Sequence, residues 1–170
     1  MATFEVSKIY EVPVARQKSG GREIELARLK LVADEDAELK TLLESKGVYV
    51  FTLKAGKGRK PWYVGKSERS TLLKEGFNSR NILSLNSLIN SRKGTLEVSF
   101  VTELRKRGKP NLREIGEIEY MLIGAAAERN HDLLNKHHVA GDTFKIRNIY
   151  NSGAGKRSNQ QAAFADIFGM

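Results

Sequence analysis

Hydrophobic and polar residues alternate in two stretches of the chain, the pattern of a β-strand with one buried face. The first stretch, Thr3–Val14, places on one face the side chains of Phe4, Val6, Tyr10 and Val12. Pro13 ends this strand or confines it to a sheet edge. The second stretch predicts a half-buried strand over Leu96–Leu104. Between them, two runs rich in Tyr, Val and Phe predict a hairpin of Val48–Leu53 and Trp62–Gly65.

Hydrophobic residues spaced three and four positions apart predict helices elsewhere. The strongest pattern runs over Leu112–Glu128, with a buried stripe formed by Ile115, Leu122, Ile123 and Ala126. Another runs over Arg80–Asn90 after a cap at Ser79, with a stripe of Ile82, Leu85, Leu88 and Ile89. Shorter helices are expected over Ala37–Ser45 and Asn159–Phe168.

The amino-terminal region has turn and capping residues that divide it. Asp34 or Asp36 can begin a helix that Gly47 ends. Gly20 and Gly21 mark a turn, and the segment Glu23–Ala33 after it fits neither the helical nor the strand period. We expect a strand returning from the turn there. The whole pattern predicts one α+β domain.

The composition adds a charge imbalance to this picture. The 170 residues carry a net charge of +9, with a pI of about 9.8. Such a balance favours a polyanionic partner, nucleic acid first and an anionic membrane second. No apolar run approaches the ~20 residues that span a bilayer, and no signal peptide is visible. The absence of cysteine excludes disulfides, thiolate zinc sites and a thiol nucleophile. We expect a soluble cytoplasmic protein.

One carboxylate stands out by its position. At about 100° per residue, Glu119 falls between Ile115 and Ile123 on the apolar stripe of the long helix. A carboxylate there is costly unless it meets a cation or hydrogen-bond donors. Glu119 is therefore the carboxylate with a chemical role, or else it is half of a structural ion pair or lies at the rim of the buried face. Glu114 and Glu117 point to the opposite side, toward solvent.

The hairpin contributes two phenols. Paired strands place neighbouring side chains within about 5 Å of each other, which brings Tyr49 and Tyr63 together. With Lys66 beside them, they suit an anionic ligand such as a phosphodiester. The alternative is an ordinary hairpin, since tyrosine is a common strand residue.

Two other motifs carry less weight. The three histidines, His131, His137 and His138, match no zinc-ligand spacing. The run 153–156 (GAGK) resembles part of a phosphate-binding loop, but Tyr150 and Arg157 stand where that loop needs glycine and Ser or Thr. We therefore expect no nucleotide cofactor.

Taken in order, four motifs resemble the GIY-YIG nuclease family. They are the tripeptides 47–49 (GVY) and 63–65 (YVG), a helix bearing 118–123 (IEYMLI), and the ending 133–135 (LLN). The resemblance implies a small three-stranded antiparallel sheet flanked by helices. It places the nuclease core at 47–135, between an amino-terminal hairpin and helix extension at 1–46 and a carboxy-terminal extension at 136–170 that packs on the core.

The resemblance also implies roles for individual residues. Glu119 would ligate one divalent ion, usually Mg²⁺ with Mn²⁺ as a substitute, while waters and phosphate fill the other positions. Tyr49 would be the general base or position the water, and Tyr63 would hold the scissile phosphate or assist. Lys66 would help a phenol to lose its proton. Asn135 would brace the site.

The chain departs from the family pattern at the catalytic arginine. The family places it about ten residues beyond the second motif's tyrosine, where this sequence has Leu73. Lys74, one step on, points about 100° away on a helix. Arg69 and Arg80 are the other candidates, so which cation serves is left open.

These observations predict a metal-dependent endonuclease that hydrolyses DNA, with RNA not excluded. Two basic loops would contact the phosphate backbone, through Lys54, Lys57, Arg59 and Lys60 and through Arg105, Lys106, Arg107 and Lys109. The alternative is a nucleic-acid-binding module that keeps the scaffold but lost catalysis, and a third is an interaction protein. A membrane partner is not expected, and the oligomeric state is open.

Overall fold

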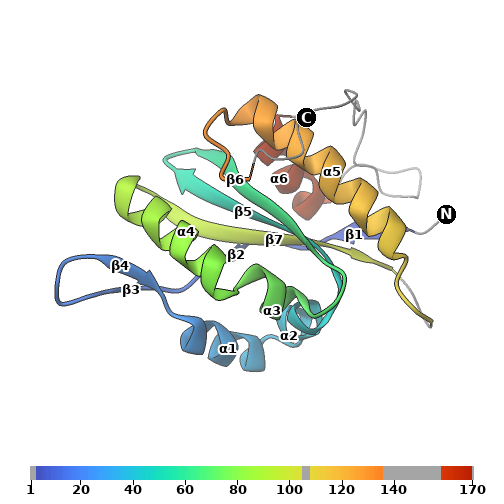
Figure 1. The fold of residues 1–170 in the computed structure, drawn as a ribbon, viewed down its shortest axis with the longest axis horizontal. Coiled ribbons are helices and arrows are strands. Elements are labelled where there is room, and N and C mark those ends of the chain that lie inside the picture. The colour runs from blue at the N-terminus through green and yellow to red at the C-terminus, as the bar shows by residue number, and fades with distance from the viewer. Residues whose placement is uncertain (1–2, 105–107, 136–157, 170) are drawn as a thin grey trace.

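The computed structural model describes residues 3–104, 108–135 and 158–169, and it has an α+β fold. Its main sheet has five strands: β1 (Phe4–Val6), β2 (Tyr10–Glu11), β5 (Gly47–Ala55), β6 (Gly58–Ser67) and β7 (Thr95–Glu103). They run in the order β1-β7-β5-β6, β2 also pairs with β7, and each pairing is antiparallel. Figure 1 shows the long strands β5, β6 and β7 at the centre.

The sheet is wider than the expected three strands because the amino-terminal strand joins it. That stretch breaks after Val6, and its two halves both pair with the outer edge of β7. Ser7 lies at the break, where its backbone nitrogen donates to the Phe100 carbonyl and its hydroxyl accepts from the Phe100 nitrogen. β7 is consequently an interior strand. It is buried on both faces, where we expected a half-buried strand.

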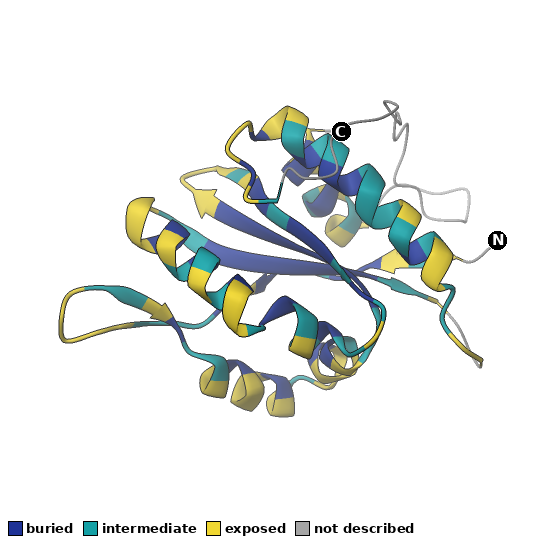
Figure 2. Cartoon of the chain, viewed as in Figure 1, coloured by how far each residue is buried: buried dark blue, intermediate teal, exposed yellow. Residues whose placement is uncertain are grey.

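Helices cover both faces of the sheet (Figures 1 and 2). On one face lie α3 (Leu72–Gly76) and α4 (Ser79–Ser91), with a core that includes Phe51, Leu85 and Phe100. On the other lie α5 (Leu112–Arg129) and α6 (Asn159–Phe168), with a core that includes Val50, Ile123 and Phe164. The stripe predicted for α5, Ile115, Leu122, Ile123 and Ala126, is buried as expected.

The amino-terminal region corrects one prediction. A two-stranded ribbon of β3 (Val14–Arg16) and β4 (Arg22–Ile24) surrounds the predicted glycine turn. The expected returning strand, however, stops at Ile24, and the helix α1 (Leu26–Glu35) follows. The helix forms because Leu29 and Ala33, four residues apart, both reach the core. The neighbouring Leu31 stays 65% exposed, which hid the helical period.

Capping residues set the helix boundaries. Asp36 caps α2 (Ala37–Glu44) by accepting from the Leu39 nitrogen, as predicted. The cap of α4 is Asn78 rather than the predicted Ser79, because its side chain accepts from the Asn81 nitrogen. None of the helices in the described ranges is long and apolar enough to cross a membrane.

Candidate active site

An irregularity in β6 lies directly beside the second tyrosine. Phe51 faces Tyr63, but the next residue of β5, Thr52, faces Pro61, so Trp62 is an extra residue in β6. Such a bulge bends a strand and often occurs beside active sites. Trp62 and Tyr63 both pack with the core beneath α4. Tyr63 lies on the same face of the sheet as Tyr49 because it pairs with Phe51, which is two residues beyond Tyr49 in β5.

The two tyrosine rings are stacked. Their centroids are 6.0 Å apart with an angle of 2° between the planes. Tyr49 is only 4% exposed, and its ring covers the backbone of Gly65, its partner across the strands. A Cβ atom at Gly65 would lie 2.4 Å from the Tyr49 hydroxyl oxygen, so only glycine leaves room for this phenol. The prediction that the hairpin brings the phenols together is confirmed.

A buried asparagine on α4 holds the Tyr49 hydroxyl. Asn81 is 3% exposed, and its Nδ2 donates to the Tyr49 hydroxyl at 3.1 Å and to the Glu75 carbonyl at 2.9 Å. Sequence reasoning missed this residue. A signal was present, because Asn81 precedes the buried Leu85 and Leu88 by four and seven positions, which places its side chain on the inner stripe of the helix.

The carboxylate singled out on α5 meets a cation. Glu119 is 17% exposed, and its Oε2 lies 3.4 Å from the Lys66 ammonium of β6. Lys66 also pairs with Glu68 at 2.8 Å, and these two carboxylates, Glu68 first, raise the pKa of Lys66. Lys66 is therefore an ammonium at neutral pH. Glu117, by contrast, is 62% exposed and pairs with Arg113 on the helix surface.

The close approach of α5 to β6 depends on a glycine. Gly116 lies one turn before Glu119, and a Cβ atom there would be 3.2 Å from the Lys66 nitrogen. The space above this glycine admits the lysine ammonium between Glu68 and Glu119.

The two phenols differ in their electrostatic surroundings. Burial raises the pKa of Tyr49 well above its usual value, and it also raises the pKa of Tyr63. At Tyr63 two influences oppose this rise in pKa: the polar hydroxyl of the neighbouring Tyr49 and the positive charge of Arg80. Glu119 raises the pKa of both phenols. Tyr63 is thus the phenol whose anionic form receives more support.

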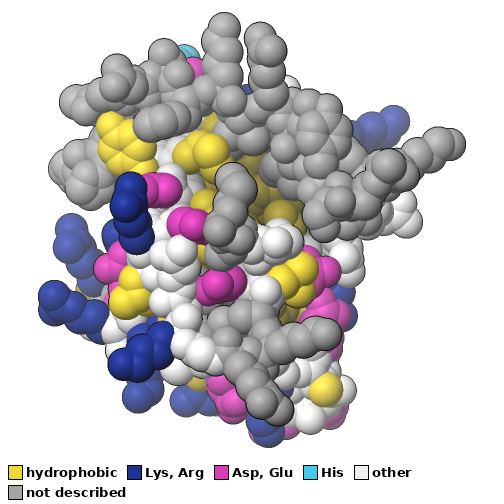
Figure 3. Space-filling model, turned by 90° about the vertical axis from the view of Figure 1, so that its right-hand side faces the viewer, with side chains coloured by type: hydrophobic (Ala, Val, Ile, Leu, Met, Phe, Trp, Pro, Cys, Tyr) yellow, Lys and Arg dark blue, Asp and Glu magenta, His cyan; other side chains and the backbone are white. Residues whose placement is uncertain are grey.

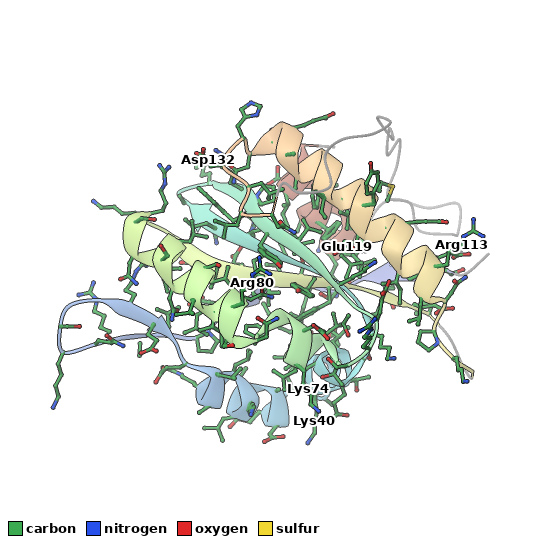
Figure 4. The ribbon with its side chains drawn as sticks, viewed as in Figure 1. Lys40, Lys74, Arg80, Arg113, Glu119 and Asp132 are labelled. Carbon is green, nitrogen blue, oxygen red and sulfur yellow. The ribbon has the colours of Figure 1, made fainter. Side chains whose placement is uncertain are left out.

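The three candidate cations lie in different places. Arg80, at the start of α4, is exposed and acts electrostatically on Tyr63. In the view of Figure 4, Arg80 extends over the sheet on the side of Glu119, whereas Lys74 lies on the far side of α3 from Glu119. Arg69 is exposed in the turn after β6. Arg80 is therefore the candidate with an interaction at the tyrosine pair.

The segment after α5 braces the edge of β6 through two asparagines. Asn135 accepts from the Val64 nitrogen at 3.3 Å, and its Nδ2 donates to the Val64 carbonyl. Asn130, fully buried, donates to the Pro61 carbonyl at 2.7 Å. Together they satisfy backbone groups that an edge strand leaves open. The bracing predicted for Asn135 has a physical basis in these bonds.

The predicted phosphate contacts divide into two groups. Lys54, Lys57 and Lys60 are exposed around the β5–β6 turn, and Lys109 is exposed before α5. Arg59 is instead held by Glu97, with an N–O distance of 2.7 Å and side chains 23% and 9% exposed. Arg105, Lys106 and Arg107 lie outside the described residues, as do His137, His138 and the run 153–156.

The donor atoms suit a metal bound through a single carboxylate. The residues described contain no group of three or more His, Asp or Glu side chains that could enclose an ion. Glu119 supplies a hard oxygen donor beside two phenols, a set that fits Mg²⁺ retaining several waters. The neighbouring Lys66 would compete with such an ion for the carboxylate.

Comparisons of this chain with protein-family models, with curated proteins and with solved structures give no match.

Proposed function

We propose that this chain is a divalent-metal-dependent endonuclease of the GIY-YIG type that hydrolyses phosphodiester bonds in DNA. The observation that carries the proposal is the convergence of three groups on Tyr63. Tyr49 stacks on it with ring centroids 6.0 Å apart, while Arg80 and Glu119 act on it electrostatically, and Glu119 in turn holds Lys66. A phenol, a carboxylate and two cations in one place suit the hydrolysis of an anionic phosphodiester, in which a water oxygen attacks phosphorus and an alkoxide leaves.

In this proposal the anionic form of Tyr63 accepts the proton of the attacking water. The water oxygen bonds to phosphorus as the bond to the leaving sugar oxygen breaks, and the leaving alkoxide takes a proton from solvent. The role expected for Tyr49 passes to Tyr63, because Tyr49 is almost fully buried and its oxygen already accepts a hydrogen bond from Asn81. Tyr49 becomes a positioning residue, because its ring stacks on Tyr63 and its hydroxyl donates to the Glu75 carbonyl at 3.4 Å.

The cations complete the arrangement. Arg80 stabilises the charge that develops on the phosphate, and its planar guanidinium can bind two phosphate oxygens at once. Lys66 remains protonated, because its pKa is raised, and therefore serves as a positive charge and not as a base. When bound at Glu119, a divalent ion supplies Lewis-acid stabilisation of the phosphate.

The direct test is plasmid cleavage. Purified protein is incubated with supercoiled plasmid in Mg²⁺ and, separately, in EDTA. The proposal expects nicked or linear products with Mg²⁺ and intact plasmid with EDTA. Binding without any cleavage, in Mg²⁺ and in Mn²⁺, would overturn it.

One observation favours a second function, a nucleic-acid-binding module without catalysis. The Lys66 ammonium already neutralises the carboxylate that would hold the metal. In addition, Leu73 stands where the related nucleases carry arginine. This module would bind DNA in a salt-sensitive manner and leave it uncut in the same plasmid experiment.

A further inference from the structure

The ribbon β3–β4 extends from one end of the molecule (Figure 1), and its strand β4 is attached to α4 at both ends. Two asparagines of α4 make the attachment. Asn90 accepts from the Arg22 nitrogen at 2.7 Å and donates to the Arg22 carbonyl at 2.7 Å, and Asn86 accepts from the Ile24 nitrogen at 3.0 Å. These side chains satisfy backbone groups on the ribbon as a neighbouring strand would. The ribbon is consequently held in one orientation.

The same attachment joins the ribbon to two basic turns. The Arg22 guanidinium donates to the Gly94 carbonyl at 3.0 Å and to the Arg92 carbonyl at 2.7 Å, in the turn between α4 and β7. Gly94 packs against the end of β5, where an added Cβ atom would lie 2.7 Å from the Lys54 carbonyl. The ribbon, the α4–β7 turn and the β5–β6 turn therefore form one continuous surface.

This surface, which we call the basic end, carries seven exposed cations: Arg16, Lys18, Lys54, Lys57, Lys60, Arg92 and Lys93. Among the described residues, an ion-pair partner is present only for Arg92, which lies 3.6 Å from Asp132. The remaining six charges are uncompensated. They are supplied by three separate turns, so they are spread across a surface and do not form a single cluster.

The opposite end of the molecule differs in charge. Figure 3 views that end, and its described surface shows Asp and Glu side chains among uncharged and hydrophobic ones near the centre, with Lys and Arg mostly around the periphery. A cavity of about 700 Å³ there is lined in part by Glu5, Glu38 and Glu103. Several cations of the described chain outside the basic end are ion-paired, among them Lys8, Lys66 and Arg113, so the unpaired cations of the basic end give a polyanion a preferred side of approach.

We propose that the basic end binds the backbone of double-stranded DNA beyond the cleavage site. The side chains between its cations are small or polar, among them Gln17, Ser19, Gly56 and Gly58, as expected for phosphate contact. The exposed large hydrophobic residues of the described chain, such as Leu31 and Leu83, lie outside these turns. A membrane-binding surface would instead combine its cations with exposed aromatic or aliphatic side chains.

The aromatic residue within the basic end indicates a duplex over a single strand. Single-strand binding relies on exposed aromatic rings on which bases stack. Trp62 is 7% exposed, and its ring is covered by Lys60 at 5.8 Å and by Arg92 at 5.7 Å. It therefore offers no stacking platform. A two-stranded ribbon, on the other hand, fits the major groove of B-form DNA, whereas the major groove of A-form RNA is too narrow.

The geometry of β6 sets the length of DNA required. Tyr63 and Gly58 are five residues apart in this strand, a separation of about 17 Å. At 3.4 Å per base step, the β5–β6 turn therefore lies about five base pairs from the proposed cleavage site. The β3–β4 ribbon supplies DNA contacts in addition to those of the β5–β6 turn.

This inference rests on the proposed function, but its test does not require cleavage. Binding is measured by fluorescence anisotropy of a labelled 24-base-pair duplex, and of its separate strands, in EDTA, with the otherwise intact chain carrying Glu119→Gln. Two double variants remove charges from the basic end: Arg16→Ala with Lys18→Ala, and Lys54→Ala with Lys57→Ala. The matched control is Lys30→Ala with Lys40→Ala, which removes two exposed cations from α1 and α2.

We expect each basic-end variant to weaken duplex binding by about tenfold and to reduce the slope of log K against log salt by about 2, one unit for each phosphate that is no longer neutralised. The control should change affinity less than twofold.

Equal weakening by the control would overturn the inference, since it would mean that net charge alone drives binding. Tighter binding of the single strands, or binding to anionic vesicles in place of the duplex, would overturn it as well. Because cleavage is absent throughout, failure of this test leaves the nuclease proposal standing.

Discussion

The Lys66 ammonium lies 3.4 Å from the Glu119 carboxylate, across the contact between the edge strand β6 and the helix α5. Burying either charge alone would be costly, so the pair makes the position of each group tolerable. The same pair places a negative oxygen donor and a positive charge beside the stacked tyrosines. The predictions below concern this arrangement and the residues that hold it.

Arg80 should be the cation that stabilises the transition state. Arg80→Ala is expected to lower the cleavage rate by about 10² to 10³, the usual effect of removing one charge-stabilising group. Lys74→Ala is the matched control, because Lys74 is exposed on the neighbouring helix and has no described interaction with Tyr63. Single-turnover cleavage rates compare the two variants. A larger loss with Lys74→Ala than with Arg80→Ala would show that Lys74 fills the role.

Gly65 should be required for the position of Tyr49. In Gly65→Ala the new methyl group would overlap the phenol, whose hydroxyl oxygen lies 2.4 Å from the Cβ position. We expect a loss of about 1–3 kcal/mol in unfolding free energy from overpacking, together with loss of cleavage. Urea unfolding followed by circular dichroism measures the former.

Gly124→Ala supplies the comparison for this substitution. Gly124 lies within α5, and no atom lies within 4 Å of its Cβ position. Alanine there should stabilise the protein by up to about 1 kcal/mol through helix propensity. If both alanine variants behaved alike, the close packing of Tyr49 on Gly65 would not be the cause.

Asn135 should stabilise the edge of β6 through both of its side-chain atoms. Asn135→Asp keeps the shape but replaces the donor to the Val64 carbonyl with a carboxylate oxygen. We expect a loss of about 1–3 kcal/mol in unfolding free energy, since a backbone carbonyl loses its partner and faces a negative charge. An unchanged urea midpoint would argue against this bracing role.

The pH dependence follows from the raised pKa of Tyr63. Because burial favours the neutral phenol, only a small fraction of Tyr63 is ionised at neutral pH, and that fraction grows tenfold per pH unit. The logarithm of the cleavage rate should therefore rise with a slope of about 1 between roughly pH 7 and 9. A rate that falls over this range would contradict a base with a raised pKa.

Stability should change in the opposite direction at still higher pH. Lys66 has a raised pKa in the folded protein, so its contribution is complete below its unfolded value and is lost as pH rises through the folded value. The buried phenols act in the same sense, because the unfolded chain releases their protons more readily. The unfolding free energy should therefore decrease above about pH 10, where unperturbed Tyr and Lys titrate.

Local patterns predicted those parts of the site that depend on one element or on adjacent strands. The helical period placed Glu119 toward the interior, and the hairpin brought Tyr49 and Tyr63 close together. Asn81 and Arg80 were different. Whether a polar residue of α4 meets a phenol of β5 or β6 depends on how the helix packs on the sheet, which no local pattern contains.

The errors in the fold have similar causes. The helix α1 forms because Leu29 and Ala33 both reach the core, although Leu31 and Val32 between them remain exposed. The bulge at Trp62 arises from the register between two strands, and a single strand's sequence does not specify it. Tertiary packing therefore determined the secondary structure and the strand register where local sequence propensity did not specify them.

The central claim is that Glu119 holds the metal on which cleavage depends, and the sharpest test compares two carboxylates of one helix. Glu119→Gln and Glu117→Gln remove the same charge from α5, but only Glu119 faces Lys66 and the tyrosines, whereas Glu117 is 62% exposed. Supercoiled plasmid is incubated with each variant and with wild type in Mg²⁺. We predict that Glu119→Gln leaves the plasmid intact while Glu117→Gln cuts it like wild type. Cleavage by Glu119→Gln at the wild-type rate would contradict the account.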